Sequence, residues 1–206
     1  MALSPGIAPL LLSLGFGFAC GSIPFGYIAG RLRGVDVLRS GSRSTGFTNV
    51  QRTLGIAWGL PVLLLDVAKG ALPTALAPGL GLAAPLVGLG CILGHVFSPW
   101  LGLRGGKGVA TALGVFGAAL GWWSVPLYVV YLAVLLAAGY VSVASLAFAL
   151  MLTPLSALVS AGDAQLVTLG LGSAIVIIAR HTDNIRRLAA GAEPRFGLWL
   201  KLFRKQ

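Results

Sequence analysis

The sequence predicts an all-α, polytopic integral membrane protein, a bundle of seven transmembrane helices with glycine-rich basic loops on the cytoplasmic side. Of its 206 residues, 57% are apolar and only 10% are charged, whereas soluble domains usually carry about 25% charged residues. The basic residues gather in three clusters, and long apolar stretches separate the clusters. Length and composition are those of a single domain, residues 1–206.

The positions of the basic residues predict the orientation of the chain. The first cluster lies within residues 31–52 and the second within residues 104–107. The third cluster comprises Arg180, Arg186, Arg187, Arg195, Lys201, Arg204 and Lys205. Between Gly108 and Ala179 only Asp163 is charged. Cytoplasmic loops are enriched in Lys and Arg, so we expect all three clusters, and the C-terminus, on the cytoplasmic side.

The number of spans follows from this arrangement. One apolar segment, about residues 8–27, precedes the first cluster, which places the N-terminus outside. Two spans, about residues 55–77 and 80–93, separate the first cluster from the second. Residues 108–179 must then contain an even number of spans. At about 20 residues per span, two crossings leave apolar chain unexplained, so we expect four shorter ones, with breaks near residues 121–123, 139–140 and 160–163.

Two features of the apolar segments have simple interpretations. Residues 1–19 contain no Lys or Arg, so they lack the basic region of a cleaved signal peptide, which is the alternative for this segment. Cys20 and Cys91 lie in apolar surroundings and are expected to be buried thiols rather than a disulfide. No group of Cys and His has the spacing of metal ligands, so we expect no metal and no cofactor.

Small and ionisable residues inside the spans predict how helices pack. Gly26 and Gly30, like Gly90 and Gly94, form small-xxx-small patterns that permit close helix contact. Asp66 and Lys69 lie three positions apart within an apolar segment. Ionisable groups inside a membrane are functional or paired, and we expect these two to pair and to brace a nearby site.

The first polar loop, "RSGSRSTGFTNVQR" at residues 39–52, has the composition of an anion-binding segment. Its glycines permit a tight backbone, its hydroxyls donate hydrogen bonds, and its guanidinium groups supply charge. The residues assigned to these roles are Gly41 and Gly46, Ser42 and Thr48, and Arg43 and Arg52. We expect this loop to hold an anionic headgroup at the cytoplasmic surface.

The second polar loop contains Gly105, Gly106, Lys107 and Gly108 immediately before a predicted helix. Glycine backbones can curl successive N–H groups around an anion, and a helix N-terminus adds partial positive charge. The segment is not a Walker A loop, because Leu101 stands at the first glycine position and Gly108 at the Ser/Thr position. The alternative is a flexible cytoplasmic turn whose basic residues only set the orientation of the chain in the membrane.

A third polar segment, residues 180–195, follows the last predicted span. If it is helical, His181, Asn184, Ile185 and Leu188 share one face. His181 and Asn184 would then point together toward the bundle beside Arg180, whereas a lone histidine is more often structural. The tail from residue 196 onward has the pattern of a basic amphipathic end.

Four segments resemble, in order and spacing, the bacterial acyl-phosphate:glycerol-3-phosphate acyltransferases, the PlsY family. They are "GSIPFGYI" (21–28), "GSRSTGFTNVQR" (41–52), "GHVFSPWLGLRGGKGVAT" (94–111) and "RHTDNIRRLAAGAE" (180–193). Members usually read Gly-Ser-Gly-Asn-x-Gly-Ala-Thr-Asn-Val in the first loop. Here Arg43, Ser44 and Phe47 replace the second Gly, the first Asn and the Ala. Arg104 stands where the family usually has Lys, which keeps the charge.

The resemblance implies a plasma-membrane enzyme that moves a fatty acyl group from acyl phosphate to the 1-hydroxyl of glycerol 3-phosphate, giving lysophosphatidic acid and phosphate. It implies catalytic roles for Ser42, Lys107, His181 and Asn184. The phosphate-binding residues implied are Gly41, Arg43, Thr48, Asn49, Arg52, Arg104, Gly105, Gly106, Gly108 and Arg180. The expected partners are the two substrates and membrane lipid, with no nucleic acid, and we expect a functional monomer.

The residues themselves leave three questions open. The proton of the attacking hydroxyl can pass to His181 or to the donor's own phosphate, and we favour the phosphate because only Asp183 is near His181 in sequence and it faces away. Ser42 as a covalent nucleophile is a weaker alternative, since no base adjoins it in sequence. An organic-phosphate transporter is the rival class, but the charges gather at one membrane face and no inverted repeat is visible.

Overall fold

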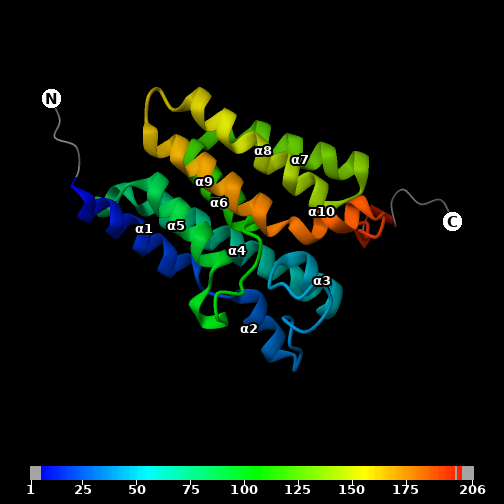
Figure 1. Cartoon of the computed structure of the whole chain (residues 1–206). Coiled ribbons are helices and arrows are strands. Elements are labelled where there is room, and N and C mark those ends of the chain that lie inside the picture. Colours follow the sequence, from blue (N-terminus) through cyan, green and yellow to red (C-terminus); the bar gives the residue numbers. More distant parts are fainter. Residues whose placement is uncertain (1–5, 198, 201–206) are drawn as a thin grey trace. The chain divides into compact units, whose positions relative to one another are not determined.

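The computed structural model describes residues 6–197 and 199–200, and in this part of the chain every regular element is a helix (Figure 1). The chain divides into two compact units, Met1–Gly121 and Trp122–Gln206. The predicted cytoplasmic residues Lys201, Arg204 and Lys205 lie outside the described residues.

Helices α1 (Ile7–Gly21) and α2 (Phe25–Leu32) open the first unit. They are followed by α3 (Phe47–Leu54), α4 (Ile56–Leu76), α5 (Ala84–Val96) and α6 (Val109–Leu120). Helix α1 packs along α5 and α4 packs along α6 (Figure 1). Short 3₁₀ turns, Pro78–Leu80 and Pro99–Leu101, lie on either side of α5. Both polar loops of this unit therefore connect helices of one packed group.

Glycines bring α1 and α5 into backbone contact, as the small-xxx-small pattern of Gly90 and Gly94 predicts. A Cβ atom on Gly90 would lie 2.2 Å from the Leu14 carbonyl oxygen, and one on Gly94 would lie 2.1 Å from that of Phe18. The pair Gly26 and Gly30 differs from this expectation. Gly26 faces the Thr45 carbonyl and Gly30 faces residues 35 and 37, so Gly26 admits the first polar loop and Gly30 admits the segment before that loop, rather than a neighbouring helix.

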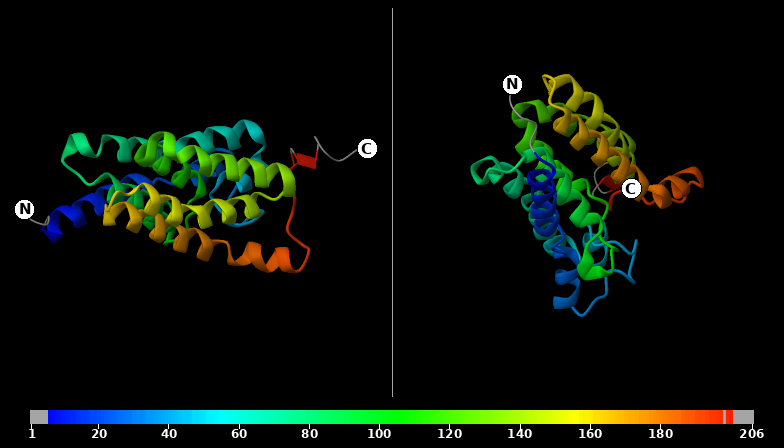
Figure 2. Two further views of the ribbon diagram at one scale, coloured as in Figure 1. Left: turned by 90° about the horizontal axis from the view of Figure 1, so that it is seen from above. Right: turned by 60° about the vertical axis from the view of Figure 1, so that its left-hand side comes forward.

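The second unit contains the 3₁₀ turn Gly121–Ser124, α7 (Val125–Ala138), α8 (Val141–Val159), α9 (Ala164–Arg180) and α10 (Thr182–Ala189). Helix α8 packs against both α7 and α9, and Figure 2 shows these helices running side by side. Asp163 caps α9 by accepting a hydrogen bond from the Gln165 N–H at 2.8 Å. Helix α10 leaves α9 at an angle of 53° after His181.

The predicted breaks in the long apolar region fall where helices end: at Gly121, at Gly139–Tyr140 and at residues 160–163. Among the described residues, five helical segments are long and apolar enough to cross a membrane, or six with the bent pair α9 and α10. The run Val109–Ala138 is one of the five, although Gly121 interrupts it in a non-helical conformation with φ 54°. The fold class is confirmed, whereas the count of seven spans stays a prediction.

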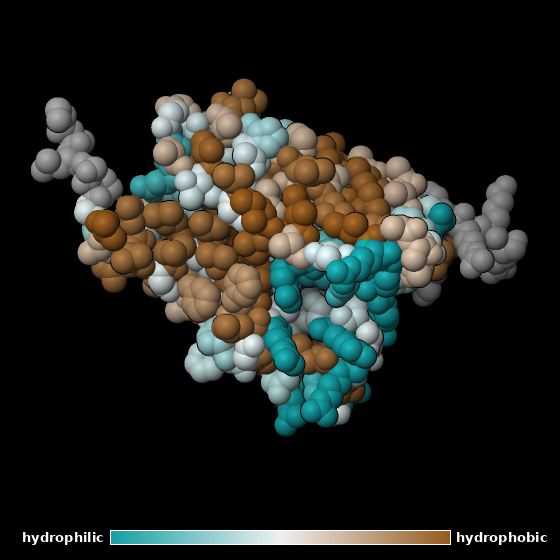
Figure 3. All heavy atoms as spheres, in the orientation of Figure 1, coloured by the Kyte–Doolittle hydropathy of each residue, from teal (hydrophilic) through white to brown (hydrophobic). Residues whose placement is uncertain are grey.

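Large apolar side chains on the surface fit a lipid environment. Leu12, Leu64 and Leu158 are 65%, 59% and 77% exposed, and contiguous apolar patches of this kind are unusual on soluble monomers. In Figure 3 hydrophobic residues cover α1, whereas hydrophilic residues gather over the part of the first unit that carries α2 and α3. The polar loops thus lie at one end of the first unit.

Candidate functional site

Asn49 organises the first polar loop from the first turn of α3. Its side chain is buried, and its Oδ1 accepts a hydrogen bond from the Ser42 N–H at 2.7 Å. Its Nδ2 donates to the carbonyls of Val37, Ser40 and Ser44 at 3.0, 3.1 and 2.8 Å. One amide side chain has one oxygen and two N–H donors. These hydrogen bonds give Asn49 a structural role in the loop.

The loop that Asn49 holds presents Ser42 and Arg43 to the outside, and both are exposed, as is Arg52 on α3. Gly41 has φ +57°, and a Cβ atom there would lie 2.3 Å from Asn49 Oδ1. A residue with a side chain at this position would push the amide away. Thr48 is half-buried at the start of α3. The predicted hydroxyl and guanidinium groups are thus accessible to an anion.

Arg43 is in the left-handed region with φ +54°, which costs L-residues other than glycine about 1–2 kcal/mol. The family resemblance implies a glycine at this position. A positive φ favours glycine, so the backbone conformation explains that preference. In this chain Arg43 adopts the same conformation although it carries a side chain.

The second polar loop differs from its predicted geometry in one respect. The Gly105 N–H donates to the Val96 carbonyl at 3.0 Å and the Gly106 N–H donates to the His95 carbonyl at 3.1 Å. These N–H groups fasten the loop to the end of α5, an arrangement that the sequence analysis did not foresee. Lys107 is half-buried and precedes Gly108, the N-cap of α6 with φ 87°. Lys107 and the first turn of α6 remain the candidate groups for an anion.

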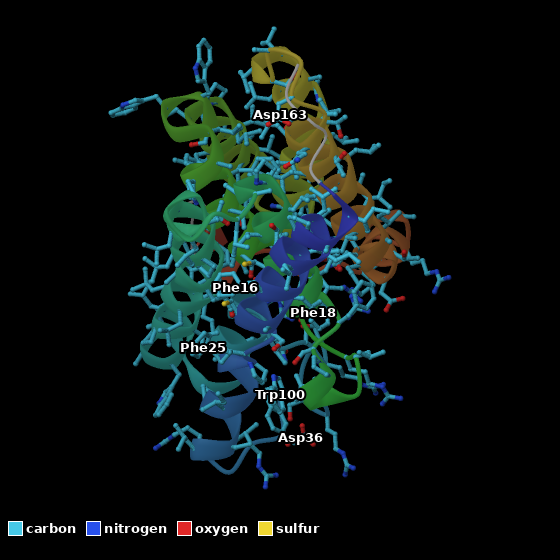
Figure 4. The ribbon with its side chains drawn as sticks, turned by 90° about the vertical axis from the view of Figure 1, so that its left-hand side faces the viewer. Phe16, Phe18, Phe25, Asp36, Trp100 and Asp163 are labelled. Atoms are coloured by element: carbon cyan, nitrogen blue, oxygen red, sulfur yellow. The ribbon has the colours of Figure 1, made fainter. Side chains whose placement is uncertain are left out.

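The second polar loop is also tied to the break between α1 and α2. The Ser98 hydroxyl donates to the Ser22 carbonyl at 2.7 Å, and the Trp100 indole N–H donates to the Ser22 hydroxyl at 3.0 Å. Figure 4 shows Trp100 and Asp36 at the same end of the first unit, the end that carries α2. These hydrogen bonds therefore join the residues that follow α5 to the break between α1 and α2, which precedes α5 in the sequence.

Asp66 and Lys69 pair inside the first unit, as predicted. Their Oδ1 and Nζ atoms are 2.8 Å apart and both side chains are buried. Lys69 also donates to the Ile23 carbonyl at 2.7 Å and lies over the Phe25 ring. His95 is a third member that the sequence analysis missed, with its Nδ1 3.6 Å from Asp66 Oδ1. No sequence signal joined His95 to this pair, because α4 and α5 supply them separately.

In the second unit, His181 stands at the junction of α9 and α10 and is buried. Its Nδ1 lies 2.8 Å from the Ile177 carbonyl oxygen. A carbonyl can only accept, so Nδ1 carries a proton and, in the neutral ring, Nε2 carries the lone pair. Asn184 is buried as well, whereas Ile185 is 43% exposed. Both His181 and Asn184 are thus buried, as the prediction that they point inward expects, whereas Ile185 lies at the surface.

Glu193 fixes Asn184 and is a further residue that the sequence analysis missed. The Asn184 Nδ2 donates to Oε1 at 2.6 Å and the Arg187 Nε donates to Oε2 at 2.7 Å. Burial raises the pKa of the Glu193 carboxyl, but these hydrogen bonds outweigh it and hold the pKa below its ordinary value. Arg180 lies exposed at the end of α9.

The C-terminal segment packs on the turn between α7 and α8. The Phe196 N–H donates to the Gly139 carbonyl at 2.8 Å. The Arg195 guanidinium lies 5.3 Å from the Tyr140 ring and 4.7 Å from the Trp199 ring. Cation–π contacts of this kind add modest stability. These contacts therefore hold Arg195 and Phe196 against the turn between α7 and α8.

These features define a multi-pass membrane protein with basic, glycine-rich loops. Residues 11–191 match the family model described as glycerol-3-phosphate acyltransferase. A glycerol-3-phosphate acyltransferase of Synechococcus sp. (strain CC9902) is 44% identical over 194 residues, covering 91% of this chain and 95% of the relative. One from Geobacter sulfurreducens is 40% identical over 182 residues, covering 87% and 93%.

A solved structure of similar fold is the integral membrane glycerol 3-phosphate acyltransferase PlsY in its glycerol 3-phosphate form. It superposes with a TM-score of 0.82 at 36% identity, covering 94% of this chain and 98% of the other. A lysophosphatidic acid form of PlsY matches equally well. The chain belongs to the glycerol-3-phosphate acyltransferase family and is an acyltransferase, which excludes the rival interpretation as a transporter.

Proposed function

We propose that the protein transfers a fatty acyl group from acyl phosphate to the 1-hydroxyl of sn-glycerol 3-phosphate. The products are lysophosphatidic acid and inorganic phosphate, and the reaction takes place at the cytoplasmic face of a bacterial plasma membrane. The N-terminus lies outside, the C-terminus lies in the cytoplasm, and the two units work together as one domain in a functional monomer.

The observation that carries this proposal is the second polar loop. Lys107 lies next to the N-terminus of α6, and the glycines before it are hydrogen-bonded to α5. A full positive charge beside a helix N-terminus favours phosphate, and a fastened loop loses little entropy when the anion binds. Lys107, Gly108 and the exposed Arg104 are the proposed phosphate contacts there. Gly105 and Gly106 act by fixing the loop.

The first polar loop supplies a second group of donors for phosphate. The exposed Ser42, Arg43 and Arg52, with Thr48 beside them, present hydroxyl and guanidinium groups. Both substrates carry a phosphate, so the reaction needs cationic donors for two anions. Gly41 and Asn49 belong to this site through the conformation they impose on the loop.

The proposed chemistry is one acyl transfer. The 1-hydroxyl oxygen attacks the acyl carbon, a new C–O ester bond forms, and the C–O bond to phosphate breaks. The hydroxyl proton passes to the departing phosphate. Acyl phosphate is already activated, so positioning and charge stabilisation are sufficient. Lys107 stabilises the charge on the leaving group, and Ser42 donates a hydrogen bond to phosphate. No metal or cofactor takes part.

His181 and Asn184 orient glycerol 3-phosphate in this proposal, with Arg180 near its phosphate. The Ile177 carbonyl holds the His181 proton on Nδ1, so Nε2 can accept a hydrogen bond from a substrate hydroxyl. Glu193 fixes the Asn184 amide and thereby its position beside the substrate. The buried, backbone-bonded histidine resembles an orienting group more than a base with a carboxylate partner.

Replacing Lys107 tests this assignment. Lys107→Ala removes a half-buried charge, so we expect turnover to fall about 10²–10³-fold, the usual cost of losing one stabilising donor. Lys107→Arg keeps the charge and should retain more activity. Membrane content and the thermal midpoint of both variants should stay near wild type. Near-normal turnover of Lys107→Ala in the membrane would show that the phosphate site lies elsewhere.

A further inference from the structure

The end of α5 and the glycine loop meet at His95. A Cβ atom on Gly106 would lie 2.0 Å from His95 Nε2 and 2.8 Å from its Cε1. The ring edge therefore rests directly on the Gly106 backbone, one residue before Lys107. Below the ring, the His95 carbonyl accepts the Gly106 N–H. The side chain and the backbone of one residue thus hold the same glycine.

The His95 ring is fixed from its other side by buried charge. It is 4% exposed, and its Nδ1 lies 3.6 Å from the Asp66 carboxylate, which is paired with Lys69. Lys69 in turn donates to the Ile23 carbonyl at the break between α1 and α2. Close packing transmits such constraints because interiors leave few voids. A continuous chain of contacts leads from Ile23 through Lys69, Asp66 and His95 to the glycine loop.

We propose that His95 is a positioning residue for the acyl transfer. The buried Asp66–Lys69 pair holds the His95 ring in place, and the ring and carbonyl of His95 set the conformation of Gly105 and Gly106. This conformation fixes the position of the Lys107 ammonium. His95 touches no substrate in this proposal. Its kinetic consequences rest on the proposed function, whereas its effect on the loop conformation does not.

The two adjacent glycines provide a matched pair for the test. A Cβ atom on Gly106 meets the His95 side chain, but one on Gly105 meets the His95 carbonyl oxygen at 1.9 Å. Shortening the histidine side chain removes the first obstruction and leaves the second. Gly79 is the control for a glycine-to-alanine change, because it lies in a turn before α5 and an added Cβ atom there would have no neighbour within 4 Å.

The experiment is a double-mutant cycle on purified protein in lipid, with kcat and KM measured for acyl phosphate and glycerol 3-phosphate. His95→Ala and Gly106→Ala should each lower kcat/KM by about 10²-fold, the cost of a 1 Å misplacement near the chemistry. The double variant His95→Ala/Gly106→Ala should be no worse than His95→Ala alone. Gly105→Ala should lower kcat/KM in the wild type and also in the His95→Ala variant. Gly79→Ala should match wild type. His95→Gln keeps a polar group near the position of Nε2 and should recover part of the kcat/KM that His95→Ala loses.

A second measurement reads the loop without any turnover. Trypsin cleaves after Arg104 and Lys107, and we expect His95→Ala to speed cleavage after Lys107 severalfold in detergent solution, with Gly79→Ala unchanged. Faster cleavage supports the positioning role even if the wild type does not transfer acyl groups, in which case only the proposed function fails. Wild-type cleavage and wild-type kinetics in His95→Ala would overturn the inference. So would a lower thermal midpoint with kcat, KM and cleavage all unchanged, or a double variant in which the two losses multiply.

Discussion

Arg43 shows how a single backbone angle constrains the first polar loop. Its φ of +54° places a charged residue with a full side chain where glycine is favoured on steric grounds. Next to it, Asn49 fills the loop interior and accepts the Ser42 N–H. Arg43 and Asn49 belong to one turn. Placing the Arg43 guanidinium at the surface in this conformation therefore costs backbone energy.

Arg43→Gly is expected to raise stability by about 1 kcal/mol, because it relieves the left-handed conformation. For a chain of this size that corresponds to a rise of about 2–4 °C in the thermal midpoint, measured by heating the detergent-solubilised protein. Arg43→Ala, which removes the same charge but keeps a Cβ atom, is the control and should show no such gain. An equal rise in both variants would indicate relief of charge repulsion instead of backbone strain.

Replacing His181 distinguishes a role in orienting glycerol 3-phosphate from a role in proton transfer. With Nδ1 bonded to the Ile177 carbonyl, we expect His181→Asn to raise the KM for glycerol 3-phosphate more than it lowers kcat, and Asn184→Ala to behave in the same way. Steady-state kinetics with glycerol 3-phosphate as the varied substrate measure both effects. A collapse of kcat with unchanged KM in His181→Asn alone would instead identify the imidazole as the base.

At the scale of elements, Glu193 connects α10 to the segment that follows it. Its carboxylate accepts from Asn184 and Arg187, and both donors come from the helix that carries the candidate site. The next residues pack on Tyr140 and Gly139. Helix α10 is short, and isolated helices of such length are marginal in water, so these contacts help to hold it in place.

This attachment is expected to weaken in acid. Hydrogen bonds lower the pKa of Glu193 in the folded protein, and the unfolded value is about 4.3. The stabilisation is therefore fully present above that value and is lost as the pH falls through the folded pKa. The protection of residues 182–193 against hydrogen exchange, corrected for the intrinsic exchange rate at each pH, should fall below about pH 4. Glu193→Gln should exchange faster than wild type above that range, without the acid step. A change of equal size at acid pH in Glu193→Gln would show that another carboxyl group causes it.

The same elements show what a sequence can and cannot predict here. Breaks at Gly121, Gly139 and residues 160–163 were predictable, because glycines and polar residues interrupt long apolar runs. The pairing of Asp66 with Lys69 followed from helical spacing and the cost of an unpaired charge in a membrane. The bonds of Gly105 and Gly106 to α5 were not predictable, since composition gives the freedom of a glycine backbone but not its partner.

At the scale of the whole molecule, the chain is a multi-pass membrane acyltransferase of the glycerol-3-phosphate acyltransferase family. Many of its charged residues lie in the polar loops and the short helices, while exposed leucines lie along the long helices. Such a distribution suits the reaction proposed above, in which a water-soluble phosphate from the cytoplasm is joined to a fatty acyl chain from the bilayer.

The most direct measurement is the donor dependence of the purified protein in lipid. Acyl phosphate, acyl-CoA and acyl carrier protein are supplied in turn with glycerol 3-phosphate, and lysophosphatidic acid and inorganic phosphate are quantified together. We expect both products in equal amounts with acyl phosphate, no phosphate release when glycerol 3-phosphate is omitted, and no lysophosphatidic acid from the other two donors, because neither presents an acyl-linked phosphate to Lys107. Comparable rates with acyl-CoA would contradict the proposed reaction.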